Sequence, residues 1–521
     1  MAIEQTREAA SGVQLAEVVS AIALAADLGL GQPLEHVLRS CAIATRFAEH
    51  LGASENDRTT TYWVSLFVAA GCTGVSFEFA KIFGDDISLR AGLGSVTSPF
   101  AFLQFVLGRA GGDASIVKKT AVRARLLATK MKTVEQAIFA HCVISTRLAE
   151  KVGLGESVTS ALMQSFARWD GKGIPRGLRG TDVVLPVRII AISDTLEVLH
   201  RERGIDGAIA GLGKLGGILL DPSLVKQCSA IAQDLIDAVD GDSSWDAIIA
   251  APPNRTLTDR ELDDALELLA DYADLKSPWF SGHSRGVASL AEAAARHAGL
   301  PERDVTSLRR AALLHDIGRN GVPNSIWDKP GPLTDDERER VRLHAYYTGR
   351  VLHRAGRLAE LEQIGSAAHE RAGGSGYPRS IAGETIPLLG RILECADVYT
   401  AMCEDRPHRP APGKDAAAQE LRRAARSGEL DGAAVDAVLA AAGHAVRSRP
   451  SAPAGLTPRE VEVLELAARG ATTKLVASRL GITPKTAGNH IERIYSKIGV
   501  SSRAEAALFA MQNGLLRPLD P

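Results

Sequence analysis

Apolar residues recur at intervals of three and four along most of this chain. The pattern is clear over residues 13–52, where glycine-rich turns such as Leu28-Gly29-Leu30-Gly31 interrupt it. Such spacing places apolar side chains on one face of a helix. Long β-branched runs with strict alternation are nearly absent, so an all-α fold is predicted. Breaks in the helical pattern are expected at 92–112, 240–257, 406–413 and 447–455.

The spacing of certain residues repeats between the two halves of the chain. In the second half, separations of 32, 25 and 28 residues join His283 to His315, His344 to His369, and His369 to Asp397. In the first half, the same separations join His36 to Val68, His141 to Phe166, and Phe166 to Asp194. The main mismatch is an insertion of 44 residues between Val68 and His141. The repeat predicts a duplicated domain.

The composition is that of a globular protein, with 45% hydrophobic and 23% charged residues in 521 positions. A formal net charge of −2 means that any DNA-binding part has to be a local basic module. The 6 cysteines form no C-x-x-C pair, which argues against a thiolate zinc site and fits a reducing cytosol. Neither a signal peptide nor an apolar run of about 18 residues is evident, so a cytoplasmic protein without a membrane partner is expected.

Six side chains of the second half form a candidate metal site. Imidazole combined with carboxylate suits iron, manganese or zinc, and carboxylates can bridge two ions. The doublet His315-Asp316 ends an apolar run, where an unpaired charge would be costly. A lone histidine is more often a surface or satisfied core residue, but this combination favours two divalent metal ions. The expected ligands are His283, His315, Asp316, His344, His369 and Asp397.

Residues 270–410 resemble an HD-GYP domain, a branch of the HD metal-dependent phosphohydrolases. The matching phrases are His315-Asp316-Ile317-Gly318, Lys329-Pro330-Gly331-Pro332-Leu333-Thr334, His369-Glu370-Arg371, Gly374-Ser375-Gly376-Tyr377-Pro378, Arg391-Ile392, Ala396-Asp397-Val398-Tyr399 and Arg406-Pro407-His408-Arg409. The resemblance implies an all-α domain that holds two, sometimes three, iron or manganese ions and hydrolyses cyclic di-GMP. It implies a catalytic role for Asp316, and for Arg319 at a substrate phosphate.

Three positions depart from the family pattern. Arg319 replaces the usual lysine, with a planar donor geometry in place of a point charge. Ala368 replaces the first histidine of His-His-Glu, which removes one potential ligand. Trp279 stands where members with three metals have glutamate, so a third ion is not expected.

The matched positions of the first half have lost most of this site. Val68 and Ala69 replace the doublet and Phe166 replaces a histidine, whereas His36, His141 and Asp194 remain. Apolar side chains in those places indicate that packing has filled the space. This half is predicted to be a degenerate HD-GYP-like domain that serves as a sensory or dimerisation partner.

The C-terminal segment has the pattern of a helix-turn-helix. Thr457-Pro458-Arg459-Glu460 is a helix start with a capping box, and further helices are expected at about 474–480 and 484–497, separated by Gly481. Residues 455–517 include nine basic and five acidic residues. The side chains expected to contact phosphates and base edges are Lys474, Lys485, Thr486, Asn489, Arg493 and Lys497.

This segment resembles the LuxR-type (GerE-type) helix-turn-helix. The phrases that carry the resemblance are Leu456-Thr-Pro-Arg-Glu-Val-Glu-Val-Leu464, Lys485-Thr486, His490-Ile491, Ile498-Gly499-Val500 and Arg503-Ala504-Glu505-Ala506. Operator DNA is the implied partner, and a homodimer is the implied state. Gly488 stands where many members place a contacting side chain.

Two tandem HD-type helical domains followed by a small DNA-binding domain are therefore predicted. The expected segments are 13–205 (degenerate domain), 206–256 (helical connector), 257–447 (metal phosphohydrolase domain), 448–454 (linker) and 455–517 (helix-turn-helix). The chain is interpreted as a transcription regulator that hydrolyses or senses a cyclic dinucleotide. The alternative is a pair of inactive HD domains that serve a DNA-binding protein as a ligand sensor or dimerisation scaffold.

Overall fold

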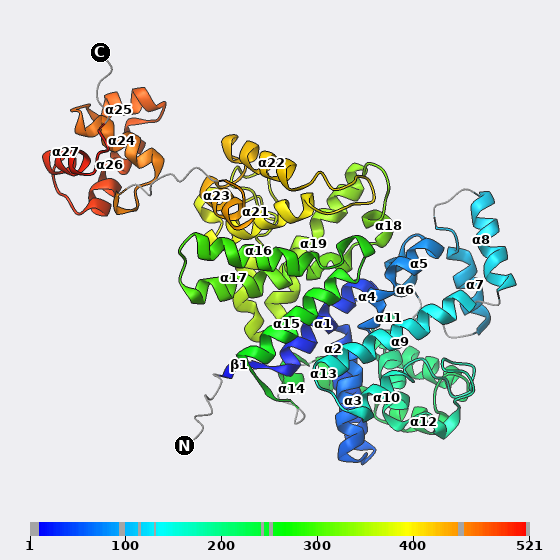
Figure 1. Cartoon of the computed structure of the whole chain (residues 1–521). Helices are drawn as coiled ribbons and strands as arrows, with labels where there is room; N and C mark the ends of the chain where they lie inside the picture. Colours follow the sequence, from blue (N-terminus) through cyan, green and yellow to red (C-terminus); the bar gives the residue numbers. More distant parts are fainter. Residues whose placement is uncertain are drawn as a thin grey trace, which may run out of the picture. The chain divides into compact units, whose positions relative to one another are not determined.

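The computed structural model describes residues 10–92, 99–112, 116–129, 132–240, 244–249, 254–445 and 453–516. Within these ranges the fold is helical, which confirms the predicted class (Figure 1). Strands β1 (Ala10–Gln14) and β2 (Thr256–Thr258) pair antiparallel, with Ala10 opposite Thr258. The chain divides into two compact units, Met1–His444 and Ala445–Pro521. The expected linker, 448–454, lies mainly outside the described residues.

The helices of the first half are α1 (Leu15–Leu30), α2 (His36–His50), α3 (Glu55–Phe67), α4 (Gly71–Gly74), α5 (Ser76–Phe83), α6 (Asp86–Ala91), α7 (Pro99–Arg109), α8 (Ile116–Ala128), α9 (Lys132–Lys151), α10 (Glu156–Leu162), the 3₁₀ turn η1 (Gly180–Asp182), α11 (Leu185–Leu215), α12 (Pro222–Ala230), α13 (Ala232–Asp240) and α14 (Ser244–Ile249). Those of the second half are α15 (Asp259–Asp274), η2 (Pro278–Phe280), α16 (His283–His297), α17 (Glu302–Leu314), η3 (Ile317–Gly321), α18 (Asn324–Trp327), α19 (Asp335–Arg354), η4 (Gly356–Leu361), α20 (Glu362–Gly365), η5 (Gly383–Thr385), α21 (Leu388–Met402), α22 (Lys414–Arg426) and α23 (Gly432–Ala441).

Helix α1 is the centre of the first compact unit. Every residue from 15 to 27 is buried. The helix is apolar on almost all sides, which is the pattern of a helix enclosed by protein. It packs against α2 and α3 of the first half and against α15, α19 and η3 of the second half. The two halves therefore share one core.

Several elements of the two halves match in the manner that the repeat predicts. Helices α2 and α16 begin at His36 and His283, and the residue before each has a φ of 78°. Backbone hydrogen bonds close corresponding loops, from Ile174 N to the Phe166 carbonyl (2.9 Å) and from Tyr377 N to the His369 carbonyl (3.0 Å). These matches support the duplication, which stays a prediction.

The insertion between the matched elements is more helical than expected. Residues 92–112 were expected to break the helical pattern, but they contain α7. Gly108 lies one position from the end of this helix, which contains no other glycine. Helix α14 likewise lies within the break expected at 240–257. Helices α4 to α8 together form the inserted segment.

The second compact unit is a bundle of short helices. It consists of η6 (Pro453–Gly455), α24 (Pro458–Ala468), α25 (Thr473–Leu480), α26 (Pro484–Ile498) and α27 (Arg503–Gln512). Val463, Val476 and Ile494 lie in its core. The predicted capping box is present, because Thr457 Oγ1 accepts from Glu460 N and Glu460 accepts from Thr457 N. The helix boundaries agree with the predicted ones within a residue.

Among the described residues, no single helix is long and apolar enough to cross a membrane. One pair of helices bent by 57°, Glu55–Gly74 with Ser76–Phe83, meets the criteria of length and composition alone.

Candidate functional site

The His-Asp doublet lies where α17 ends and η3 begins. Thr348 of α19 fixes this corner, because its hydroxyl donates to the His315 carbonyl (2.8 Å) and accepts from Gly318 N (3.1 Å). Gly318 is required by space, since a Cβ there would lie 2.1 Å from the His344 carbonyl oxygen. This close packing brings the doublet against His344.

The structure brings all six predicted metal ligands together in two groups. The first consists of His283, His315, Asp316 and Asp397, and the second of Asp316, His344 and His369. Asp316 belongs to both. Its Oδ2 lies 2.9 Å from His315 Nε2 and 3.4 Å from His283 Nε2, whereas its Oδ1 lies 3.3 Å from His344 Nε2. Each oxygen of one carboxylate thus faces a different donor group.

Contacts behind the histidines aim their Nε2 atoms at this carboxylate. The Nδ1 of His315 bonds to the Ala312 carbonyl at 2.7 Å, and that of His344 to the Val341 carbonyl at 2.5 Å. Glu404 lies 2.8 Å from the Nδ1 of His283. Such outer contacts fix the ring orientation of metal-binding histidines. Glu404 was missed in the sequence because it follows His283 by 121 positions and belongs to no matched spacing.

The donor set fits a bound cation. His315 and Asp316 are 0% exposed, and His315 Nε2 and both Asp316 carboxylate oxygens have no partner with hydrogen-bond geometry among the described residues. Unpaired buried polar atoms are costly unless something else satisfies them. The imidazole and carboxylate donors of the two groups are the ligands that divalent iron, manganese or zinc prefer.

Protonated histidines offset the negative charge of the carboxylates in these donor groups. Burial lowers the pKa of His283, but Asp316, Asp397 and Glu404 outweigh burial and raise it to about 10. Burial also lowers the pKa of His315, which Asp316 raises to about 9. Burial raises the pKa of Asp316, but Arg319 and His315 hold it well below the usual range. A divalent cation would replace the protons on these histidines.

Two arginines flank one aromatic ring beside the donor groups. The guanidinium carbon of Arg319 lies 4.1 Å from the centre of the Phe280 ring, and that of Arg406 lies 5.1 Å from it. Arg319 pairs with Asp316, yet its Nε and Nη1 are buried without hydrogen-bond partners among the described residues. Arg406 donates to the Trp279 carbonyl and to Glu404, both at 2.8 Å. The pair concentrates positive charge at the edge of the donor groups, where a phosphate would be stabilised.

All six predicted DNA-contacting side chains are exposed on the second compact unit. Lys485, Asn489, Arg493 and Lys497 recur every four residues along one side of α26, whereas Ala487 and Ile494 lie in the core. Lys497 also pairs with Glu460 of α24 at 2.8 Å. A Cβ at Gly488 would meet only Thr473 Cγ2, at 4.0 Å, so packing does not require a glycine there.

Models of known families match both of these regions. Residues 267–434 match the HD domain, and residues 454–510 match the bacterial regulatory proteins of the LuxR family. The chain contains an HD domain and a LuxR-type helix-turn-helix domain. The resemblances of these two regions to the HD phosphohydrolases and to the LuxR-type helix-turn-helix are confirmed.

Several phosphodiesterases of cyclic dinucleotides resemble this chain. The chain is 28% identical over 404 residues to 3'3'-cGAMP-specific phosphodiesterase 3 of Vibrio cholerae. The aligned region covers 76% of this chain and 88% of that protein. The chain is 36% identical over 185 residues to the cyclic di-GMP phosphodiesterase response regulator RpfG of Xanthomonas campestris, 35% of this chain and 47% of that protein. A crystal structure of a cyclic GMP-AMP-specific phosphodiesterase of V. cholerae matches with a TM-score of 0.59 and 25% identity, over 83% of this chain and 99% of that one.

Outside the matched HD domain, the first half has no comparable donor group among its described residues. His36 is held by ion pairs to Glu197 (2.6 Å) and Asp194 (3.2 Å), which use both of its ring nitrogens. His141 packs edge-on against Phe166, with 5.0 Å between the ring centres. Burial lowers the pKa of His141 to about 3, so this histidine is neutral. These contacts support the expected structural role of the histidines that remain.

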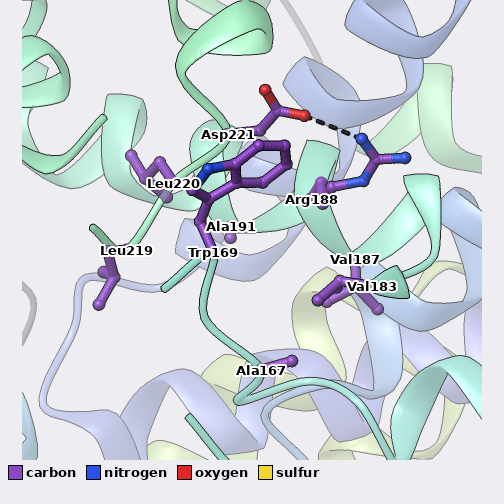
Figure 2. Close-up of a pocket in the computed structure, with 9 residues that line it drawn as sticks. All are labelled: Ala167, Trp169, Val183, Val187, Arg188, Ala191, Leu219, Leu220 and Asp221. Atoms are coloured by element: carbon purple, nitrogen blue, oxygen red, sulfur yellow. Dashed lines mark hydrogen bonds and ion pairs between the residues drawn. The ribbon is translucent and has the colours of Figure 1, made fainter. Parts of the chain in front are cut away.

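A small pocket of the first half holds too little space for a nucleotide. Figure 2 shows Trp169 and the ion pair between Arg188 and Asp221 (2.8 Å) beside it. Its volume of about 10 Å³ is close to that needed by one water molecule.

Proposed function

We propose that the HD domain is a metal-dependent phosphodiesterase that opens a 3',5'-linked cyclic dinucleotide such as cyclic di-GMP or cyclic GMP-AMP. The observation that carries the proposal is the buried carboxylate of Asp316, whose two oxygens face separate donor groups. The named activities of the relatives agree with this reaction class.

His283, His315 and Asp397 would hold one divalent ion, and His344 and His369 would hold a second. Asp316 belongs to both groups and would contribute to both. Iron or manganese is the best match to the donors, and zinc is the alternative. Two such ions lower the pKa of a bound water and neutralise charge on a phosphodiester. Arg319 and Arg406 would take charge from the phosphate oxygens, since both guanidinium groups border the donor groups.

Metal content and hydrolysis of the purified full chain test this proposal. Iron, manganese and zinc are measured per chain, and cyclic di-GMP and cyclic GMP-AMP are followed by chromatography. We expect about two metal ions and turnover in the wild type. Asp316→Ala is expected to lose both, whereas Asp336→Ala, at an exposed position of α19, should keep both. If the metal-loaded wild type leaves both nucleotides intact, the proposed phosphodiesterase activity is contradicted.

We also propose that the LuxR-type domain binds operator DNA as a homodimer, and that occupancy of the HD domain changes this binding. The exposed polar side of α26 supports the DNA contact. Leu508 and Met511 of α27 are 51% and 59% exposed, which offers an apolar surface to a second copy. A protein that acts on the chromosome would work in the cytoplasm.

We further propose that the first half is a degenerate duplicate of the HD domain. The matched starts of α2 and α16 and the matched loop hydrogen bonds support this origin. Such a half would serve as a partner of the active one and not as a second catalytic centre.

A further inference from the structure

An acidic side chain of the insertion is buried in the contact between the two halves. Asp86, the first residue of α6, is 0% exposed. Its Oδ2 accepts from Arg90 of its own helix (2.9 Å) and from Lys276 of the second half (3.1 Å). Burial raises the pKa of Asp86, but Lys276 and Arg90 outweigh burial and lower it. The carboxylate is therefore an anion beside Arg90 and Lys276. Burial lowers the pKa of the Lys276 amine, and the Asp86 carboxylate opposes that shift.

The other oxygen of Asp86 contacts the start of a short helix of the HD domain. Its Oδ1 accepts from Asn324 N, at the first residue of α18, with a distance of 2.9 Å. The Asn324 side chain donates to the Lys276 carbonyl (2.5 Å) and to Asp328 (3.1 Å), and Asn324 is 0% exposed. Asp86 thus binds two segments of the HD domain that Asn324 also ties to each other.

Each of the two segments includes, a few residues further along the chain, a side chain that contacts Arg319. Trp327, one turn after Asn324, donates its Nε1–H to the Arg319 carbonyl at 3.3 Å and packs edge-on against His344. Lys276 precedes η2, whose Phe280 lies under the Arg319 guanidinium at 4.1 Å and edge-on against Trp327 at 5.2 Å. Arg319 has its backbone and its guanidinium fixed by the ends of the two segments that Asp86 joins.

We propose that Asp86 is a positioning residue through which the insertion of the first half sets the place of Arg319 in the HD domain. This inference rests on the proposed function for its effect on hydrolysis, but the contacts do not depend on turnover. An ion pair is a costly way to fill a core, and apolar residues of similar volume often stabilise as much. Directional bonds to Lys276 and Asn324 define one register of α18 against the insertion.

The test compares four variants of the full chain with the wild type. Asp86→Asn keeps the size of the side chain but removes its charge. Glu35→Gln is the matched control, because Glu35 also pairs across the two halves, with Arg354 at 3.3 Å, away from α18. Arg319→Ala and the double variant Asp86→Asn/Arg319→Ala show whether the effect passes through Arg319.

Hydrogen exchange is the first readout and needs neither metal nor substrate. In Asp86→Asn, amides of residues 317–328 are expected to exchange about tenfold faster or more, whereas Glu35→Gln leaves them unchanged. The second readout is kcat/KM for a cyclic dinucleotide at unchanged metal content. It is expected to fall about 10- to 100-fold in Asp86→Asn, with no further loss when Asp86→Asn is added to Arg319→Ala.

Wild-type protection of residues 317–328 in Asp86→Asn would overturn the inference, and so would independent losses in the double variant. If the wild type hydrolyses no cyclic dinucleotide, the proposed function fails. Exchange, together with the affinity of the manganese-loaded protein for inorganic phosphate, then still decides the role of Asp86. If Asp86→Asn does not fold, Asp86→Asn/Lys276→Met removes the fully buried amine that has lost its ion pair, while Arg90 keeps its bonds to the Gly29 and Cys72 carbonyls. That variant should fold with faster exchange in 317–328, and wild-type protection in it would contradict the inference.

Discussion

At the residue scale, buried acids of this protein differ in whether burial or a neighbouring cation decides their pKa. Arg319 and His315 hold the pKa of Asp316 far below its usual value in spite of burial. Burial dominates at Asp27 and at Glu394, and raises their pKa values to about 8 and about 9. Asp316 is thus anionic at neutral pH and ready to hold a cation, whereas Asp27 and Glu394 keep their protons.

Replacement of Asp27 by asparagine should change how stability depends on pH. The folded state keeps the proton of Asp27 up to about pH 8, whereas the unfolded chain releases it near pH 3.8. The folded state therefore binds the extra proton between these values, and the wild type loses stability as pH rises through them. Asp27→Asn does not titrate, so its stability relative to the wild type should increase by roughly 1 kcal/mol per pH unit.

Thermal unfolding at pH 5, 6, 7 and 8 measures this difference, with Asp336→Asn as an exposed control. Parallel pH curves for the wild type and Asp27→Asn would show that Asp27 is already ionised in the folded protein.

The carboxylate of Glu404 should matter for metal binding although it is not a ligand. It accepts a hydrogen bond from His283 Nδ1 and so fixes the ring. Loss of an outer contact of this kind weakens metal binding about 10- to 100-fold, which is the expected effect of Glu404→Gln. Competition with a chelator measures the affinity, and Glu384→Gln, at an exposed position, is the control. An unchanged affinity would mean that His283 is oriented by packing alone.

At the scale of single elements, α26 packs into the core with one side and is expected to contact DNA with the other. Its apolar side supplies Ala487 and Ile494 to the core, and Thr483 caps its start by accepting from Thr486 N at 3.1 Å. Its other side carries exposed polar residues that no core contact needs. Substitutions on the exposed side should therefore change binding without unfolding the domain.

Asn489→Ala combined with Arg493→Ala should abolish specific DNA binding. Each contact to a base edge contributes about 1–3 kcal/mol, so the double variant should bind about 100-fold more weakly or worse. The probe is a DNA site that the wild type selects from a random library, and the affinity is measured at fixed salt. Glu492→Ala, on the same helix, should not weaken binding. Full affinity in the double variant, with the melting temperature unchanged, would refute the assignment of α26.

At the scale of the whole molecule, both halves of the chain up to His444 build the unit that contains the candidate metal site. Helix α1 is buried between both halves, and Asp86 reaches the HD domain from the insertion. Residues up to His444 form one compact unit. We therefore expect metal binding and hydrolysis to require this entire unit.

A chain that ends at His444 should keep the metal content and the turnover of the full protein and lose DNA binding. A chain that begins at residue 254 should be poorly soluble, because it exposes the apolar surface that α1 covers. Metal analysis, chromatography and gel filtration measure these properties. Full activity in the shorter chain from residue 254 would show that the HD domain is independent of the first half.

The sequence by itself determined the local features of this protein. Helical periodicity, the capping box at Thr457 and the His315-Asp316 doublet depend on residues a few positions apart, and near neighbours set backbone conformation. The spacing of the six candidate ligands was also visible in the sequence, and the structure brings these six residues together. The helix α7 was missed because glycines at 92, 108, 111 and 112 indicated a loop more strongly than its apolar residues indicated a helix.

Only the tertiary structure decided which distant residues meet. Glu404 lies against His283 across 121 positions, and Asp86 binds Lys276 across 190. No periodicity records such contacts, because they depend on how whole helices pack around α1. The shared core places Asp86 of the insertion against Lys276 of the HD domain, where the two buried charges lie 3.1 Å apart.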